Sequence, residues 1–157
     1  MYLTEQQIEV IWSSYDHLRA RSPEVCDYLF NKLFQYDPGL RTLFGEDMRE
    51  HGQTYWRAFG MLVARARNFE SLEPVLKNLA NRHADYGVTP KHYTLFGNAM
   101  LFAFKMVLEE AFDKPTRQAW VAFFRLMSKY MKHEAYGEAF DLAPVDTETF
   151  LQFDKSA

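Results

Sequence analysis

Residues 72–93 have the sequence LEPVLKNLANRHADYGVTPKHY, which predicts a helix with a histidine on its apolar face. The residues that recur at helical spacing are Leu72, Leu76, Leu79, Ala80 and His83. Ser71 is expected as the N-cap, and Pro74 falls in the first turn, where a missing N–H costs little. A histidine on such a face is usually a core residue hydrogen-bonded to a backbone carbonyl, so His83 alone does not establish a ligand site.

A second helix, predicted from His51 to Ala66, also has a histidine at the end of its apolar stripe. The other members of that stripe are Tyr55, Ala58, Phe59, Leu62 and Ala66. Two helices therefore each turn one histidine toward the interior, where the donor and the acceptor of each ring must be satisfied away from water. A flat apolar cofactor with a metal at its centre would satisfy both His51 and His83.

The other segments are also predicted to be helical. Their expected starts are Thr4 with Gln7, Ser22-Pro23, Asp37-Pro38, Thr89-Pro90 and residues 113–116. The helix that begins at Asp37-Pro38 is short, ending near Leu43-Phe44, and residues 45–50 are expected to be a polar connector. Residues 89–111 are apolar on nearly all sides, which indicates a central helix. No strand-like alternation occurs, so the sequence predicts an all-α fold.

The two segments that contain His51 and His83 resemble those of a known family, the globins. Residues 51–62, HGQTYWRAFGML, resemble the distal helix of myoglobin-type globins. Residues 79–93, LANRHADYGVTPKHY, resemble the proximal segment of bacterial haemoglobins and of the haemoglobin half of flavohaemoglobins. Pro38 with Leu43-Phe44 is similar to the globin corner. The resemblance covers about residues 4–134 and implies a globin fold, with helices packed around a haem pocket.

Length and composition fit such a protein. The chain has 157 residues, enough for one domain with a substantial core, and it is rich in aromatic residues, with 14 Phe, 9 Tyr and 3 Trp. A net charge of −3 argues against nucleic acid or an anionic membrane as the main partner. Residues 1–9 lack the features of a signal peptide, and the longest apolar run, residues 99–104, is far short of the roughly 20 residues of a membrane span. We expect a soluble cytoplasmic protein.

The resemblance implies that the cofactor is haem b, with His83 as the proximal ligand of the iron. Cys26 is the only cysteine, so the Cys-x-x-Cys-His motif of covalent attachment is absent. In flavohaemoglobins a tyrosine ten residues after the proximal histidine supports the imidazole, and Tyr93 stands at that spacing. A glutamate on the last helix does the same in that family, but the matching position here is Ala135, and Glu134 is its neighbour. Whether Glu134 takes this role stays open.

Other positions are assigned to the cofactor by the same resemblance. Phe44 is expected to pack flat on the haem, and Val88 to contact it after the proximal helix. Arg82 and His92 are weaker candidates that could neutralise haem propionates at the pocket edge. His17 and His133 have no partner pattern and are expected at the surface.

The expected distal pocket consists of Phe30, His51 and Tyr55. His51 matches the residue that hydrogen-bonds bound oxygen in myoglobin, but the same spacing would let it bind iron as a sixth ligand, as in neuroglobin-like globins. Phe30 stands where bacterial haemoglobins commonly have a tyrosine, which weakens a dedicated role in nitric oxide dioxygenation. Tyr55 could supply the missing hydroxyl or narrow the pocket. A shifted register would place Thr54 at the iron; the unbroken match from His51 to His83 favours His51.

The leading functional hypothesis is a haem globin that reversibly binds O2 or another diatomic ligand, NO or CO, for oxygen binding, transport or storage. The alternatives are a nitric oxide dioxygenase or peroxidase-type enzyme that needs a separate reductase, and a haem-based gas or redox sensor. A haem-free globin fold used as an interaction module is disfavoured by the two interior histidines. The expected partners are a diatomic gas, an external reductase and a second copy in a homodimer.

We divide the chain into a globin domain, residues 1–136, and an acidic C-terminal extension, residues 137–157. The extension has five acidic residues against Lys155 alone, contains Pro144, and carries three large apolar side chains near its end, Phe150, Leu151 and Phe153. Such a segment either frays or docks on the body or on a second subunit.

Overall fold

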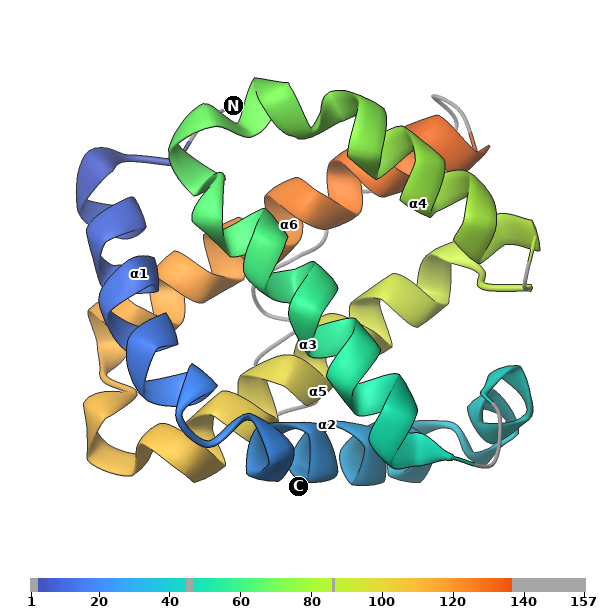
Figure 1. Ribbon diagram of the computed structural model, residues 1–157, viewed down its shortest axis with the longest axis horizontal. Helices are drawn as coiled ribbons and strands as arrows, with labels where there is room; N and C mark the ends of the chain where they lie inside the picture. The colour runs from blue at the N-terminus through green and yellow to red at the C-terminus, as the bar shows by residue number, and fades with distance from the viewer. Residues whose placement is uncertain (1–2, 45–46, 86, 137–157) are drawn as a thin grey trace.

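The computed structural model describes residues 3–44, 47–85 and 87–136, and for residues 132–136 it describes the helical backbone only. The elements are α1 (Glu5–Arg19), α2 (Ser22–Tyr36), η1 (Pro38–Leu43), α3 (Met48–Ala64), η2 (Ala66–Leu72), α4 (Glu73–Asp85), α5 (Pro90–Leu108), η3 (Glu109–Ala111) and α6 (Lys114–Tyr136), where η marks a 3-10 helix. Within these ranges no strand occurs, which confirms the all-α class (Figure 1). None of the described helices is both long and apolar enough to cross a bilayer.

The predicted start signals are local hydrogen bonds in the structure. The Thr4 hydroxyl accepts from the Gln7 backbone N–H at 3.1 Å, and the Gln7 side chain accepts from the Thr4 N–H at 2.9 Å, a capping box for α1. Asp37 caps η1 by accepting from the N–H of Gly39 at 3.0 Å. Asp113 accepts from the N–H of Thr116 at 3.0 Å at the start of α6. These starts were predictable because donor and acceptor lie within three residues of each other.

Two predicted boundaries are wrong. Ser71 does not cap α4, because its hydroxyl donates to the Asn68 carbonyl at 2.7 Å and residues 66–72 form η2 instead. Residues 45–50 are not all connector, because α3 already begins at Met48, where Asp47 accepts from the Glu50 N–H at 3.1 Å. In both cases a short polar side chain selects a turn that hydrophobic periodicity does not report.

The core is an aromatic cluster around Trp120 of α6. The indole is completely buried, lies 4.8 Å from the Phe104 ring and 5.8 Å from the Phe59 ring, and donates from Nε1 to the Ser14 hydroxyl at 2.8 Å. Phe123 and Phe124 of α6 complete the cluster. This cluster joins α1, α3, α5 and α6, and so includes the helix that carries His51, whereas the helix that carries His83, α4, packs on α6.

The helices are packed in crossed pairs (Figure 1). The central helix α5 packs along α2 and against α6, as its apolar sequence predicts. The helix with His83, α4, packs against the C-terminal half of α6 and against η2 rather than along α3. The 3-10 helix η2 links α3 to α4, and the two helices diverge from this corner (Figure 1).

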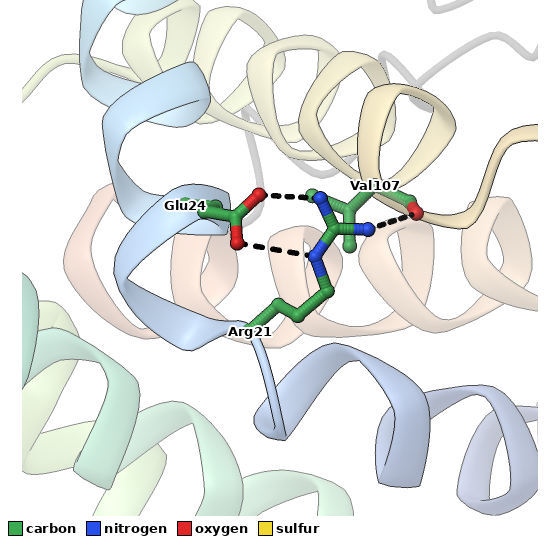
Figure 2. Close-up of polar contacts among 3 residues, drawn as sticks. All are labelled: Arg21, Glu24 and Val107. Carbon is green, nitrogen blue, oxygen red and sulfur yellow. Dashed lines mark hydrogen bonds and ion pairs between the residues drawn. The ribbon is translucent and has the colours of Figure 1, made fainter.

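The corner between α1 and α2 is tied to the end of α5 by one arginine (Figure 2). Arg21 donates from Nη1 to the Val107 carbonyl at 3.1 Å and forms an ion pair with Glu24. Both charged side chains are about half exposed, so solvent screens the pair and its contribution to stability is small. The bond to Val107 ties the corner between α1 and α2 to the last turn of α5.

Gly60 of α3 provides a test of this packing. A Cβ at Gly60 would lie 2.5 Å from the Tyr15 hydroxyl oxygen, and the Tyr15 ring is stacked on Trp56 at 5.5 Å. We therefore expect Gly60→Ala to lower the free energy of unfolding by about 1–3 kcal/mol, although Gly to Ala in a helix normally stabilises by about 1 kcal/mol. Urea unfolding measures the change.

The same substitution in a Tyr15→Phe background serves as the control. Without the hydroxyl, the nearest Tyr15 atom to the new methyl is Cζ at 3.6 Å, an ordinary contact. Gly60→Ala should then stabilise by up to about 1 kcal/mol through helix propensity. A Gly60→Ala penalty that persists in the Phe background would mean that the clash is not its cause.

Candidate functional site

Phe44 and His51 are brought together by the short element η1 and the first turns of α3. Their ring centroids lie 5.8 Å apart at an interplanar angle of 83°. Phe30 of α2 packs edge-on against Phe44 at 5.5 Å. The His51 imidazole is half-buried and therefore stands at the edge of an aromatic wall.

A close approach of α2 and α3 sets the position of His51. Gly52 is buried, and a Cβ there would lie 3.3 Å from the Cys26 Cβ, so a larger residue would force the helices apart. The Cys26 thiol donates to the Gly52 carbonyl across a 3.6 Å Sγ to oxygen distance. Burial raises the pKa of Cys26 to about 11, so the group is a neutral thiol that packs like a small apolar residue.

Tyr55 extends the wall one turn further along α3. Its ring lies between Phe30, at 6.4 Å, and Phe96 of α5, at 5.1 Å. The hydroxyl donates to the Met100 sulfur at 3.1 Å, and its burial raises the pKa of Tyr55 well above the usual value. The ring is partly accessible while the hydroxyl is enclosed. The Tyr55 hydroxyl proton is therefore committed to Met100 of α5.

His83 lies in the last turn of α4 and is half-buried. Its Nδ1 is buried and has no hydrogen-bond partner of normal geometry among the described residues. Burial lowers the pKa of His83, and the backbone carbonyl of Leu79, one turn earlier, opposes this by raising it. The lowering dominates, so the imidazole is neutral at pH 7, which is the form that binds a metal ion.

The turn after α4 fixes His83 relative to the start of α5. The Val88 N–H donates to the His83 carbonyl at 3.0 Å, and Gly87 has φ +91°, a conformation that an L side chain rarely adopts. Thr89 is the N-cap of α5, and Pro90 follows it, as predicted. Val88 is half-buried at this corner. A short turn thus holds α4 and α5 in a set relation.

Tyr93 lies in the first turn of α5, on the same side as His83. The two rings meet edge to face with centroids 6.2 Å apart, and the Tyr93 hydroxyl oxygen is buried. The ten-residue spacing noted in the sequence therefore corresponds to a direct ring contact. Tyr93 of α5 thus packs against the His83 imidazole of α4.

The remaining sequence candidates lie at the edge of the site or outside it. His92 accepts from the Thr89 N–H at Nδ1, 3.0 Å, and its Nε2 lies 3.9 Å from an Asp37 carboxylate oxygen, which links α5 to η1. Arg82 is exposed, and His17 is a surface residue of α1, as predicted. The predicted roles of Glu134 and His133 depend on side chains outside the described residues.

A cleft opens between α3 and α4 beyond the two histidines. It is lined by Ala58, Met61, Leu62, Arg65, Leu72, Val75, Asn78, Leu79 and Arg82. Ala58, Leu62, Leu72 and Leu79 belong to the apolar stripes that the sequence predicted. Met61, Arg65 and Val75 were missed, because they lie off both stripes and only the divergence of α3 from α4 brings them together.

No three His, Cys, Asp or Glu side chains gather into a metal-binding cluster in the described part of the chain. His51 and His83 instead come from separate helices, α3 and α4, each beside aromatic rings. A helical domain of this architecture, with one histidine on each of two neighbouring helices and a very short third element, is of the globin type.

The chain belongs to the globin family. The family model described as Globin matches residues 27–131, which include both histidine segments and most of the described structure. This confirms the family that the sequence resemblance indicated.

Relatives and a solved structure agree with this assignment. A flavohemoprotein of Rhizobium meliloti is 28% identical over 159 residues, 99% of this chain and 36% of the relative, and one of Vibrio cholerae is 24% identical over 136 residues, 84% of this chain and 34% of the relative. The chain thus spans about a third of these relatives. A neuroglobin of Chaenocephalus aceratus is 26% identical over 80% of this chain and 87% of its own. The crystal structure of a hexacoordinated haem protein from an anhydrobiotic tardigrade superposes with a TM-score of 0.77 at 15% identity, covering 85% of this chain and 95% of that one, which shows the shared fold.

Proposed function

We propose that this chain is a haem b-binding globin that reversibly binds O2 or another diatomic ligand, NO or CO. The observation that carries the proposal is the state of His83. Its imidazole is neutral, half-buried and held edge-on by Tyr93, while its buried Nδ1 has no bond of normal geometry to any described residue. In a ring that packs only as a core residue, a buried nitrogen is normally satisfied by a hydrogen bond of good geometry.

The residues present fit a haem. His83 would hold the iron from α4, with the Leu79 carbonyl available to accept from its other nitrogen, the arrangement that orients and strengthens a ligating histidine. Phe44, Tyr55 and Val88 would provide apolar contact with the ring. Cys26 is buried against α3, so it is not available for a thioether bond, which favours noncovalent haem b.

A bound haem would supply an iron centre with an open position for a diatomic ligand. His51 is the residue of the aromatic wall that would act at this position, because Phe30 and Phe44 have no polar group and the Tyr55 hydroxyl is committed to Met100. The imidazole would either donate a hydrogen bond to the exogenous ligand or occupy the position itself. In both cases the apolar rings around it exclude water and strengthen the interaction.

The visible absorption spectrum tests the proposal. We expect the purified, haem-reconstituted protein to show a Soret band and, once reduced, to form stable CO and O2 complexes. His51→Ala should remove any low-spin ferrous bands or, if His51 acts as a donor, speed O2 dissociation about tenfold or more, as expected for a lost charge-assisted hydrogen bond.

Thr54→Ala is the matched control for this test, because Thr54 is the alternative distal residue and is exposed on α3. It should leave both the spectrum and the O2 dissociation rate unchanged. A Thr54→Ala effect larger than the His51→Ala effect would place the distal residue in the other register. A chain that takes up no haem would refute the proposed function.

The flavohemoprotein relatives favour a second candidate function. The matched region is about a third of each relative. As the second candidate we propose the reaction of bound O2 with NO to give nitrate, with a reductase supplying the electrons for repeated turnover. Mixing the oxygenated protein with NO and measuring nitrate tests the single-turnover reaction. Repeated turnover only in the presence of an added reductase would support the partnership. If the added NO is not consumed and no nitrate forms, the reaction of O2 with NO is excluded as a function.

A further inference from the structure

Helices α1 and α5 begin with the same hydrogen-bond arrangement but with different acceptors. At α1 the Gln7 side-chain oxygen accepts from the Thr4 N–H at 2.9 Å, and at α5 the Nδ1 of His92 accepts from the Thr89 N–H at 3.0 Å. In both helices the acceptor stands three residues after the N-cap, where a capping box usually has Glu or Gln. A Gln amide keeps its acceptor oxygen at every ordinary pH, whereas an imidazole nitrogen stops accepting once it is protonated. The cap of α5 is therefore titratable, and the cap of α1 is not.

The bond to Thr89 fixes the form of the His92 ring. Because Nδ1 accepts a hydrogen bond, the ring is neutral and its proton is on Nε2. Nε2 faces Asp37, with 3.9 Å between Nε2 and the carboxylate oxygen Oδ2. This distance is longer than a hydrogen bond, so the bond to Thr89 is the one that holds the neutral ring.

Asp37 is itself a helix cap. Its Oδ1 accepts from the Gly39 N–H at 3.0 Å at the start of η1, and its Oδ2 is the oxygen that faces His92. The pair thus joins the starts of η1 and α5. The first of these elements leads to Phe44, and the second follows the turn after His83. The two sides of the candidate site are therefore connected at this edge by one aspartate and one histidine.

The charges around His92 decide when it takes up a proton. Its side chain is 20% exposed, and burial, the largest effect, lowers the pKa of His92. Among the described residues, Asp37 at the start of η1 raises this pKa and Lys91 of α5 lowers it. The net result is a pKa below the usual value of about 6.5. The neutral ring therefore contributes stability that is fully present above about pH 6.5 and is lost as the pH falls through the lowered pKa.

We propose that His92 is a pH-operated cap that switches between α5 and η1. The neutral ring accepts from the Thr89 N–H and holds the first turn of α5. The protonated ring has two N–H donors and no acceptor, so it releases Thr89 and donates to Asp37, the carboxylate that faces it. Acidification thus loosens the start of α5 and the corner after His83, and it strengthens the tie to η1. The switch belongs to the chain itself and does not depend on the proposed cofactor.

Nuclear magnetic resonance of the full-length protein tests the switch. If the protein contains haem, reduction under CO keeps the sample diamagnetic, so the test is valid whether or not haem binds. We expect the His92 proton on Nε2 at neutral pH, and a Thr89 amide signal that shifts with the same midpoint as His92 when the pH is lowered to about 5. The Thr4 amide at the α1 cap is the internal reference and should not follow that midpoint.

His92→Gln is the matched variant, because it gives α5 the same acceptor that Gln7 provides at α1. The Thr89 amide should then no longer titrate. A Thr89 amide that does not follow His92 in the unmodified chain, or that titrates equally in His92→Gln, would overturn the switch.

Two charge variants test the tie to η1. Asp37→Asn keeps a good cap for η1 but removes the negative charge, so it should shift the His92 midpoint to lower pH. Lys91→Gln removes an exposed positive charge from α5 and should shift the midpoint to higher pH. Opposite shifts support the proposal. A midpoint that Asp37→Asn leaves unchanged would show that His92 is not coupled to η1.

Urea unfolding measures the consequence for the fold. On lowering the pH from about 7.5 to about 5, the equilibrium constant for folding should fall about fivefold more in the unmodified chain than in His92→Gln, the size of one lost cap. The other histidines are present in both proteins, so their titration contributes equally to each. Parallel losses in the two proteins would show that protonation of His92 does not weaken the start of α5, and the proposal would be wrong.

Discussion

Replacing His83 with glycine is expected to abolish stable haem retention, and added imidazole is expected to restore it. The half-buried ring leaves a space beside Tyr93 that free imidazole can enter. Altering groups that only orient a metal ligand typically costs 10–100-fold in metal affinity. We therefore expect loss of the ligand itself to speed haem dissociation at least 100-fold, measured as transfer of haem to an acceptor apoprotein, with recovery of the Soret band as imidazole is added.

Two other histidines serve as controls for this experiment. His17→Gly changes an exposed residue of α1, and His92→Gly changes the histidine that accepts from Thr89 at the start of α5. Neither should change haem dissociation by more than a few-fold, and imidazole should have no effect on either. If His83→Gly kept haem as well as the unmodified chain, or if His92→Gly lost it instead, the assignment of the proximal ligand would be wrong.

Trp120→Ala is expected to lower the free energy of unfolding by about 3–5 kcal/mol, the range for removing a fully buried large aromatic residue. Trp120 contacts Phe59, Phe104, Phe123 and Phe124, so its removal opens a cavity where four elements meet. It also removes the Nε1 bond to Ser14. Urea unfolding should be measured on the apoprotein, because bound haem would add its own stabilisation.

The matched control for the core is Trp56→Ala. Trp56 is only half-buried and stacks on Tyr15 at 5.5 Å, so its loss should cost clearly less, about 1–2 kcal/mol. Ser14→Ala tests the hydrogen bond, because it removes the acceptor of the Nε1–H and leaves the indole in place. Equal losses for Trp120→Ala and Trp56→Ala would show that the core is not centred on Trp120.

Much of the fold could be predicted because its determinants are local. The capping box of Thr4 and Gln7 and the cap of α5 at Thr89-Pro90 depend on atoms at most three residues apart, and the structure confirms both. The apolar stripes of α3 and α4 have a helical period, so the sequence alone predicted His51 and His83 on inward faces. Both side chains are half-buried in the structure. The failures at Ser71 and at residues 48–50 are boundary errors of a few residues, where a side-chain hydrogen bond decided the turn.

The site was predicted less completely. The residue types and their spacing predicted that His83 and Tyr93 belong to one side of the site, and that His51 and Phe44 also belong to the site. The structure brings each pair into ring contact. The partner of the Tyr55 hydroxyl was not predictable, because Met100 lies 45 residues further along the chain. Hydrophobic periodicity assigns Tyr55 to the inner face of α3 but does not say which atom of α5 its hydroxyl reaches.

The sequence by itself therefore determined which segments are helical, which face of each helix is apolar, and that two of these faces end in an imidazole. Only the tertiary structure decided that α4 packs against α6 rather than along α3, which opens the cleft and leaves Met61 and Val75 exposed. Helix formation and capping depend on residues within about four positions, which a pattern can report. The angle at which two helices diverge depends on how all their side chains pack together, and no local pattern contains that information.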